Sequence, residues 1–136
     1  MDFNKLTLKA QEAVAAAMDL ARRQGNPEVY PEHLILALLD QELPQTLVER
    51  AGGSVADLRA KAEAALAAKP AVQGTAAQQP RASAAFSRVL DEAEQEMRKL
   101  QDDFVSTEHV LLALDLLPRD RLEQALKEVR GSQRVT

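Results

Sequence analysis

The sequence predicts an all-α fold in which two related helical repeats form one compact bundle. Apolar residues recur at three- and four-residue spacing along most of the 136 residues, which is typical of helices with one buried face. No segment alternates apolar and polar residues as a half-buried strand would. The chain also resembles itself, because VYPEHLILAL at 29–38 is matched by VSTEHVLLAL at 105–114, an offset of 76 (105 − 29). Similarity at a fixed offset indicates structural units that bury one another's faces.

The first repeat, assigned to residues 1–68, begins with two long apolar patterns. A first helix is predicted over about 7–24, with Thr7 as its N-cap and Gly25 as its stop. A second helix begins at Pro31, because proline is tolerated in a first turn where its missing N–H has no partner. The residues after it are apolar on every side, so this helix is predicted to be central and buried.

Two further helices and a linker are predicted to follow. Pro44 begins a short third helix that ends at the glycines of 52–53, and Ser54 caps a fourth. Residues 69–81 read KPAVQGTAAQQPR, whose prolines, glycine and small polar residues predict a linker.

The pattern restarts in the second repeat, assigned to residues 82–131. Ser83 is the predicted cap of its first helix, Thr107 caps the second, and Gly131 ends a last helix that starts at about Arg119. The residues predicted to face inward from the first of these helices are Phe86, Val89, Leu90, Ala93, Met97 and Leu100.

The second repeat is shorter than the first. Leu58 matches Leu122 best, at an offset of 64 (122 − 58), so about 12 residues (76 − 64) are missing there. The missing piece corresponds to the short third helix. We therefore predict seven helices rather than eight.

Composition excludes several classes of protein. The net charge is −4 and the basic residues near the end alternate with acidic ones, which argues against a nucleic-acid partner. There is no cysteine, no signal-peptide pattern and no apolar run of membrane-spanning length, so we expect no membrane partner and a cytoplasmic location. His33 and His109 have no second histidine at ligand spacing, so no metal site is predicted.

The repeated PEHLILALL and TEHVLLAL segments, with the opening DFNKLTLKAQEAV, resemble the N-terminal domain family of the Clp chaperones. The ending LKEVRGSQRVT resembles the junction that leads into the first ATPase module in ClpB-type members, so residues 132–136 would start that linker. The resemblance covers essentially the whole chain. It implies a domain that binds exposed apolar segments of unfolded or aggregated proteins in a groove between the repeats.

The resemblance also implies partners and an absence of catalysis. The domain would be attached to a hexameric ATPase and would pass its substrates to the pore of that ATPase. A co-chaperone system would be a further partner. No GxxxxGK[ST] phosphate loop occurs in the sequence, so we expect a binding module without a cofactor rather than an enzyme.

Five polar residues are candidate substrate-binding residues. Thr7, Ser83, Asp102 and Glu108 match positions that the ClpB family associates with chaperone activity. Glu32 is the repeat counterpart of Glu108, and in ClpC-type relatives the matching glutamates hold phosphoarginine, whose guanidinium suits paired carboxylates. A structural role is the alternative for each, since Thr7 and Ser83 can be helix caps and first-turn carboxylates favour the helix dipole.

Val89 and Leu90 are the apolar candidates for the groove, beside Leu6, Leu8 and Val14, although apolar residues at helical spacing usually belong to the core. Three rival functions remain at this point. They are a ClpC-type adaptor or phosphoarginine-docking domain, an enzyme that uses the glutamates and histidines as acid–base groups, and a purely structural domain. The absence of a nucleophile motif or cofactor loop argues against the enzyme.

Overall fold

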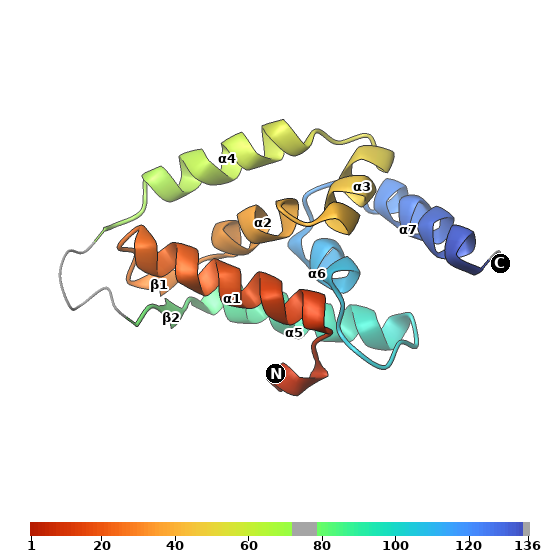
Figure 1. Ribbon diagram of the computed structural model, residues 1–136, viewed down its shortest axis with the longest axis horizontal. Helices are drawn as coiled ribbons and strands as arrows, with labels where there is room; N and C mark the ends of the chain where they lie inside the picture. Colours follow the sequence, from red (N-terminus) through yellow and green to blue (C-terminus); the bar gives the residue numbers. More distant parts are fainter. Residues whose placement is uncertain (72–78, 135–136) are drawn as a thin grey trace.

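Seven α-helices follow one another in the two predicted groups within the part of the chain that the structure, a computed structural model, describes: residues 1–71 and 79–134 (Figure 1). The predicted all-α class, the number of helices and the shortened second repeat are confirmed. The elements in chain order are η1 (Phe3–Lys5), α1 (Leu8–Arg23), β1 (Glu28–Val29), α2 (Pro31–Leu39), α3 (Glu42–Arg50), α4 (Val55–Ala67), β2 (Arg81–Ala82), α5 (Ala84–Lys99), α6 (Thr107–Leu114) and α7 (Arg119–Arg134).

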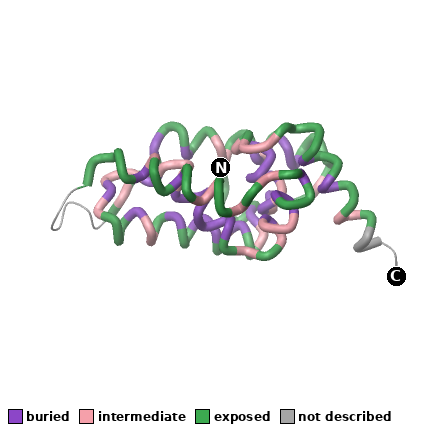
Figure 2. The backbone as a smooth tube through the Cα atoms, turned by 90° about the horizontal axis from the view of Figure 1, so that it is seen from above, coloured by how far each residue is buried: buried purple, intermediate pink, exposed green. Residues whose placement is uncertain are grey.

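The second helix of each repeat lies at the centre. Residues 33–39 of α2 are all buried, as the continuous apolar run predicted, and α6 is buried in the same way over 109–113. The longer helices α1 and α5 lie beside them and are buried along one side only, so that buried residues line the inner faces of the helices (Figure 2).

Two short parallel pairings tie the repeats to each other. Leu6 pairs with Val105, and Ala82 pairs with Val29. Residues 6 and 82, like 29 and 105, are repeat counterparts at the offset of 76. Each repeat therefore adds the segment before its first helix to the loop before the other's second helix, which is the relation expected of a pseudo-twofold axis.

The last helix departs from this symmetry. In the first repeat α4 packs along α2, whereas α7 packs mainly against α3 of the other repeat and touches α6 less (Figure 1). The approach is close at Gly53, where an added Cβ would lie 2.5 Å from Leu117 of the α6–α7 loop. Loss of the short helix thus brings the end of repeat two against repeat one.

Several predicted details are wrong by a residue or more. Ser106, not Thr107, is the N-cap of α6, and α3 begins two residues before Pro44. Helix α7 continues through Gly131, because glycine weakens a helix without ending it unless the chain turns there. Leu100, predicted to face inward, is 38% exposed. The predicted linker begins after α4 as expected, but most of it, residues 72–78, lies outside the described residues, as do 135–136.

Candidate functional site

A groove of about 890 Å³ lies where the two repeats meet, between the starts of α1, α3 and α6. We call it the inter-repeat groove. The residues that line it are Thr7, Leu8, Lys9, Glu12, Asp40, Gln41, Glu42, Leu43, Thr46, Ser106, Thr107 and Glu108. Two of the seven predicted site residues, Thr7 and Glu108, therefore lie in one groove although they are a hundred residues apart in the sequence.

The groove combines an exposed apolar side chain with acidic ones. Leu8 is 76% exposed, more than any other large apolar side chain among the described residues. Leu43 is half-buried beside it. Of the acidic residues, Glu12 lies 3.5 Å from Lys9, whereas Glu42 is exposed and has no ion pair within the described chain. The surface suits a ligand that carries apolar groups, with a bias against acidic ones.

Thr7 and Ser83 have equivalent structural roles. The Thr7 hydroxyl accepts the Ala10 N–H (3.2 Å), and the Ser83 hydroxyl accepts the Phe86 N–H (3.0 Å). The backbone N–H of Thr7 donates to Val105, as that of Ser83 does to Val29. Both predicted N-caps are confirmed, and capping satisfies N–H groups that would otherwise lack partners.

Arg130 of α7 joins two of the predicted acidic site residues. Its guanidinium donates to Glu108 (2.7 and 3.1 Å) and to Asp102 (2.7 and 3.4 Å). Burial alone would raise the pKa of Asp102, but hydrogen bonds from Arg130 and His109 outweigh it, so this pKa is below its usual range. Asp102 is therefore ionised, and Arg130 holds both carboxylates in place from α7.

Each repeat also contains a buried histidine that caps its own helix. His33 Nδ1 accepts the Tyr30 N–H (2.9 Å), and His109 Nδ1 accepts the Ser106 N–H (2.8 Å). Because Nδ1 is an acceptor, the proton of the neutral ring is on Nε2, which donates to Asn26 in repeat one and to Asp102 in repeat two. Within the described residues no three metal-binding side chains gather, and these rings have a structural role.

The two repeats differ at this point. Asn26 and Leu66 in repeat one take the places of Asp102 and Arg130, at offsets of 76 and 64, and line one hollow together. Glu32, the counterpart of Glu108, consequently has no hydrogen bond or ion pair to any described residue and is half-buried. The predicted equivalence of the two glutamates extends to their position but not to their partners.

The remaining predicted residues lie elsewhere. Val89 and Leu90 are half-buried on α5, pack against the core, and are not among the residues that line the inter-repeat groove. Sequence reasoning missed Thr46 and Arg130. The alternating basic and acidic residues around Arg130 predict a solvated helix face. Arg130 had a signal, since it follows the inward-facing Leu126 by one helical turn, but its partners lie more than twenty residues away.

The chain is similar to known proteins over its whole length. Residues 5–129 match the Clp repeat (R) N-terminal domain family. The chaperone protein ClpB of Propionibacterium freudenreichii subsp. shermanii is 37% identical over 151 aligned positions, which cover 100% of this chain and 17% of that protein. ClpB of Bacillus cereus is 37% identical over 153 positions, covering 100% and 18%. The chain thus spans less than a fifth of the length of these relatives.

Solved structures share the fold. The N-terminal domain of Hsp104 from Candida albicans superposes with a TM-score of 0.80 at 27% identity, covering 96% of this chain and 94% of that one. The N-domain of ClpV in complex with a VipB peptide has a TM-score of 0.76 at 20% identity, covering 98% and 92%. No described helix has the length and apolar character that crossing a bilayer requires.

Proposed function

This chain belongs to the Clp repeat N-terminal domain family, and on that premise we propose that it is the substrate-recognition domain of a ClpB-type protein disaggregase. In this proposal the inter-repeat groove binds exposed apolar segments of unfolded or aggregated proteins. The ATPase modules that would receive them belong to the much longer relatives, of which this chain spans 17–18%.

The observation that carries the proposal is the exposure of Leu8 within the groove. A leucine that is 76% exposed at a junction of three helix starts contributes little to the stability of the domain itself. Burial of apolar surface stabilises a complex by roughly 25 cal/mol per Å², without any fixed sequence requirement. One or two such side chains give weak binding, on the order of micromolar to millimolar, which suits a domain that must release its substrates.

The proposal assigns further properties to the domain by its family. It holds no cofactor, acts in the cytoplasm, and is attached to a hexameric ATPase that a co-chaperone system assists. The peptide in the ClpV N-domain complex supports a binding role for this fold in general, and no residue of that complex is carried over.

A ClpC-type phosphoarginine site is less well supported. Such a site needs free carboxylates at Glu32 and Glu108, but Arg130 already donates a guanidinium to Glu108 at 2.7 Å. Of these two glutamates, only Glu32 has a carboxylate without a cationic partner among the described residues. One free carboxylate offers fewer contacts to the ligand than the symmetric pair that the sequence predicted.

A pair of substitutions on one helix tests the proposal. Leu8→Ser removes the exposed apolar side chain, and Met18→Ser is the matched control, since Met18 is 46% exposed on the same helix but outside the groove. Binding of a permanently unfolded protein, measured by fluorescence anisotropy, should weaken about five- to tenfold for Leu8→Ser, the loss of one leucine's burial. It should stay unchanged for Met18→Ser. Equal affinities for both variants and the wild type would mean that the unfolded protein does not bind in the inter-repeat groove.

A further inference from the structure

A second groove, of about 570 Å³, lies between α5, α6 and α7 on the side of the molecule where α7 has moved away from α6. We call it the α7 groove. Its apolar base and rim consist of Leu100, Leu112 and Leu126, and its charged rim of Glu96, Lys99, Arg119, Glu123, Lys127 and Arg130. No function assigned above uses this groove.

The same position in repeat one is filled. There α4 packs along α2, and the hollow that remains, lined by Gln24, Glu63 and Leu66, measures about 280 Å³. Repeat two has no counterpart of the short helix α3, and α7 packs against α3 itself. At this place the shorter second repeat therefore has a groove of about twice the volume of the hollow in repeat one.

Leu100, on the rim of the α7 groove, is an exposed apolar residue where repeat one has a polar one. Leu100 is 38% exposed at the C-cap of α5, where its repeat counterpart is the polar Gln24. Leu112 and Leu126 beneath it are 6% and 4% exposed, so the apolar surface continues inward from Leu100. An exposed leucine in place of a glutamine, on the rim of a groove, offers a partner apolar surface to bury.

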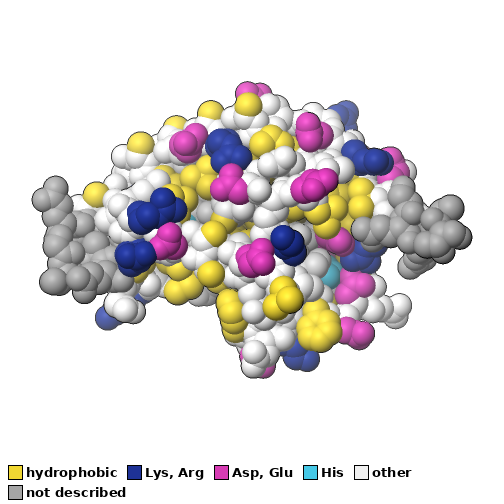
Figure 3. All heavy atoms as spheres, in the orientation of Figure 1, with side chains coloured by type: hydrophobic (Ala, Val, Ile, Leu, Met, Phe, Trp, Pro, Cys, Tyr) yellow, Lys and Arg dark blue, Asp and Glu magenta, His cyan; other side chains and the backbone are white. Residues whose placement is uncertain are grey.

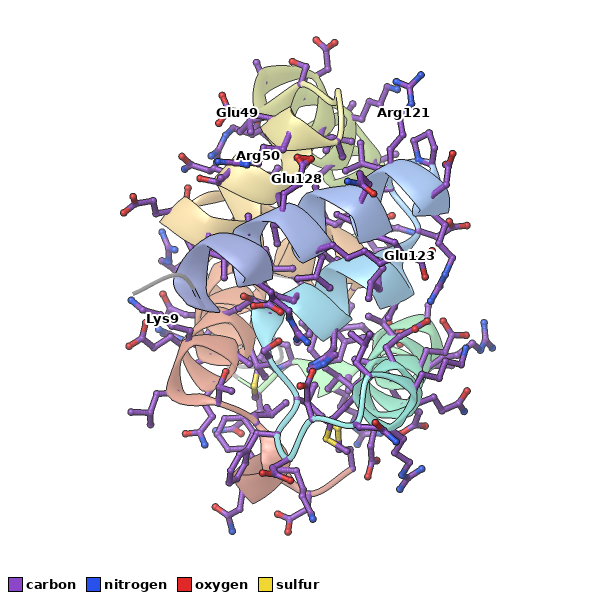
Figure 4. All side chains as sticks on the ribbon, turned by 90° about the vertical axis from the view of Figure 1, so that its right-hand side faces the viewer. Lys9, Glu49, Arg50, Arg121, Glu123 and Glu128 are labelled. Atoms are coloured by element: carbon purple, nitrogen blue, oxygen red, sulfur yellow. The ribbon has the colours of Figure 1, made fainter. Side chains whose placement is uncertain are left out.

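Charge at this end of the groove is basic. Lys127, whose repeat counterpart is the acidic Glu63, has no ion pair within the described chain. The Lys99 side chain is 66% exposed and lies 4.0 Å from Glu96. The acids Glu96 and Glu123 are both bound by Arg119, at 2.5 and 3.3 Å. In the view with α7 in front, Glu123 lies on the side of α7 that is next to α6, whereas Arg121 and Glu128 lie on the side next to α3 (Figure 4). Further acids, Glu92 and Asp115, line an adjoining hollow together with Arg119 and Lys99.

We propose that the α7 groove binds a short amphipathic helix of a partner protein, with leucine-type side chains over Leu100 and Leu112 and carboxylates facing Lys99 and Lys127. An apolar groove beside two helices takes a third helix through side chains at three- and four-residue spacing. The basic rim, in which Lys127 has no ion pair within the described chain, selects an acidic polar face on that helix. This site is separate from the inter-repeat groove and does not depend on its function.

Two designed peptides test the proposal on the whole domain. The first is a helix of about 16 residues with leucines at i, i+3, i+4 and i+7 and glutamates at its polar positions. The second carries lysine in place of each glutamate. Amide NMR titration should show shifts at Leu100, Leu112 and Lys127 with the acidic peptide, and affinity about tenfold lower for the basic one. Absence of these shifts, or equal affinity for both peptides, would overturn the proposal.

Three variants distinguish this site from the substrate groove. Leu100→Gln restores the residue of repeat one, and Lys127→Glu restores its charge; both positions are exposed, so circular dichroism should show intact folding. Each should weaken the acidic peptide about three- to tenfold. Leu8→Ser, in the other groove, should leave this peptide unaffected. If Leu8→Ser lost the peptide while Lys127→Glu still bound it as tightly as the wild type, the peptide would lie in the inter-repeat groove and the α7 site would be refuted.

Discussion

Arg130 donates a 2.7 Å hydrogen bond to Glu108, so a carboxylate that lines the inter-repeat groove already has a cationic partner from α7. The same guanidinium donates to Asp102, which in turn accepts a hydrogen bond from Nε2 of His109. Hydrogen bonds thereby join α7 to the start of α6, through Glu108, and to the start of the loop before α6, through Asp102.

The apolar side chains of the projecting N-terminal turn are a separate exposed surface (Figure 3), where Met1 is 43% and Phe3 47% exposed.

Removal of this guanidinium should destabilise the domain. In Arg130→Gln the partly buried carboxylates of Asp102 and Glu108 lose their cation and repel each other, at a cost of about 1–3 kcal/mol. Urea unfolding at neutral pH measures the change. Arg121→Gln, on the same helix but without a hydrogen bond or ion pair among the described residues, is the control and should stay within about 0.5 kcal/mol of wild type. An Arg130 variant as stable as this control would show that the network contributes nothing.

The repeat-one histidine makes a pH-dependent contribution to stability. Burial lowers the pKa of His33, and the charge of Glu32 offsets this only in part. Because the folded pKa lies below the unfolded value of about 6.5, stability is present above that pH and is lost as the pH falls below it. Asn26→Asp places a carboxylate on His33 Nε2, as repeat two has, and should raise the pKa of His33. NMR titration of its ring protons measures this; a pKa unchanged or lowered in Asn26→Asp contradicts the assigned hydrogen bond.

Gln101 is strained in a position that glycine occupies in the other repeat. Its φ is 59°, and its counterpart Gly25 has a φ of 73°. In both repeats the backbone N–H of the next residue donates to a carbonyl of the helix, Asn26 to Ala21 and Asp102 to Met97. This is the Schellman motif at a helix C-terminus. Gln101→Gly should stabilise the domain by up to about 1 kcal/mol, since the left-handed conformation is unfavourable for side chains. Thermal unfolding tests this, with Gly25→Ala expected to destabilise; a lower midpoint for Gln101→Gly would refute it.

Contact between the repeats at Gly53 should be sensitive to one methyl group. An added Cβ would meet Leu117 at 2.5 Å and Val48 at 3.1 Å. Gly53→Ala should therefore cost about 1–3 kcal/mol through overpacking. The double variant with Leu117→Ala should recover part of that loss, because the clashing atoms are gone. Additive losses in the double variant would mean that Leu117 does not press on Gly53.

The helices were predictable because each depends on local pattern. Thr7, Ser83 and Ser54 signal helix starts by capping chemistry that acts within three residues, and each caps as predicted. The repeat itself follows from matched segments. The cap of α6 was misplaced by one residue, since Ser106 and Thr107 are both suitable caps in sequence.

What escaped prediction depends on the position of α7. By the offset of 64, α7 is the counterpart of α4, but it packs mainly against α3 and not along the second helix of its own repeat. In this position α7 borders the α7 groove, with Leu100 on the rim, and its Arg130 reaches Asp102 and Glu108. Contacts of this kind join residues 22 and 28 positions apart, and no local pattern encodes them.

Amide NMR of this domain during titration with a permanently unfolded protein tests the central claim most directly. The account predicts shifts that gather at Leu8, Leu43, Thr46 and Glu108 along the inter-repeat groove, and their disappearance in Leu8→Ser. Shifts confined to Val89 and Leu90, or none at concentrations up to about the millimolar range expected for weak binding, would contradict it.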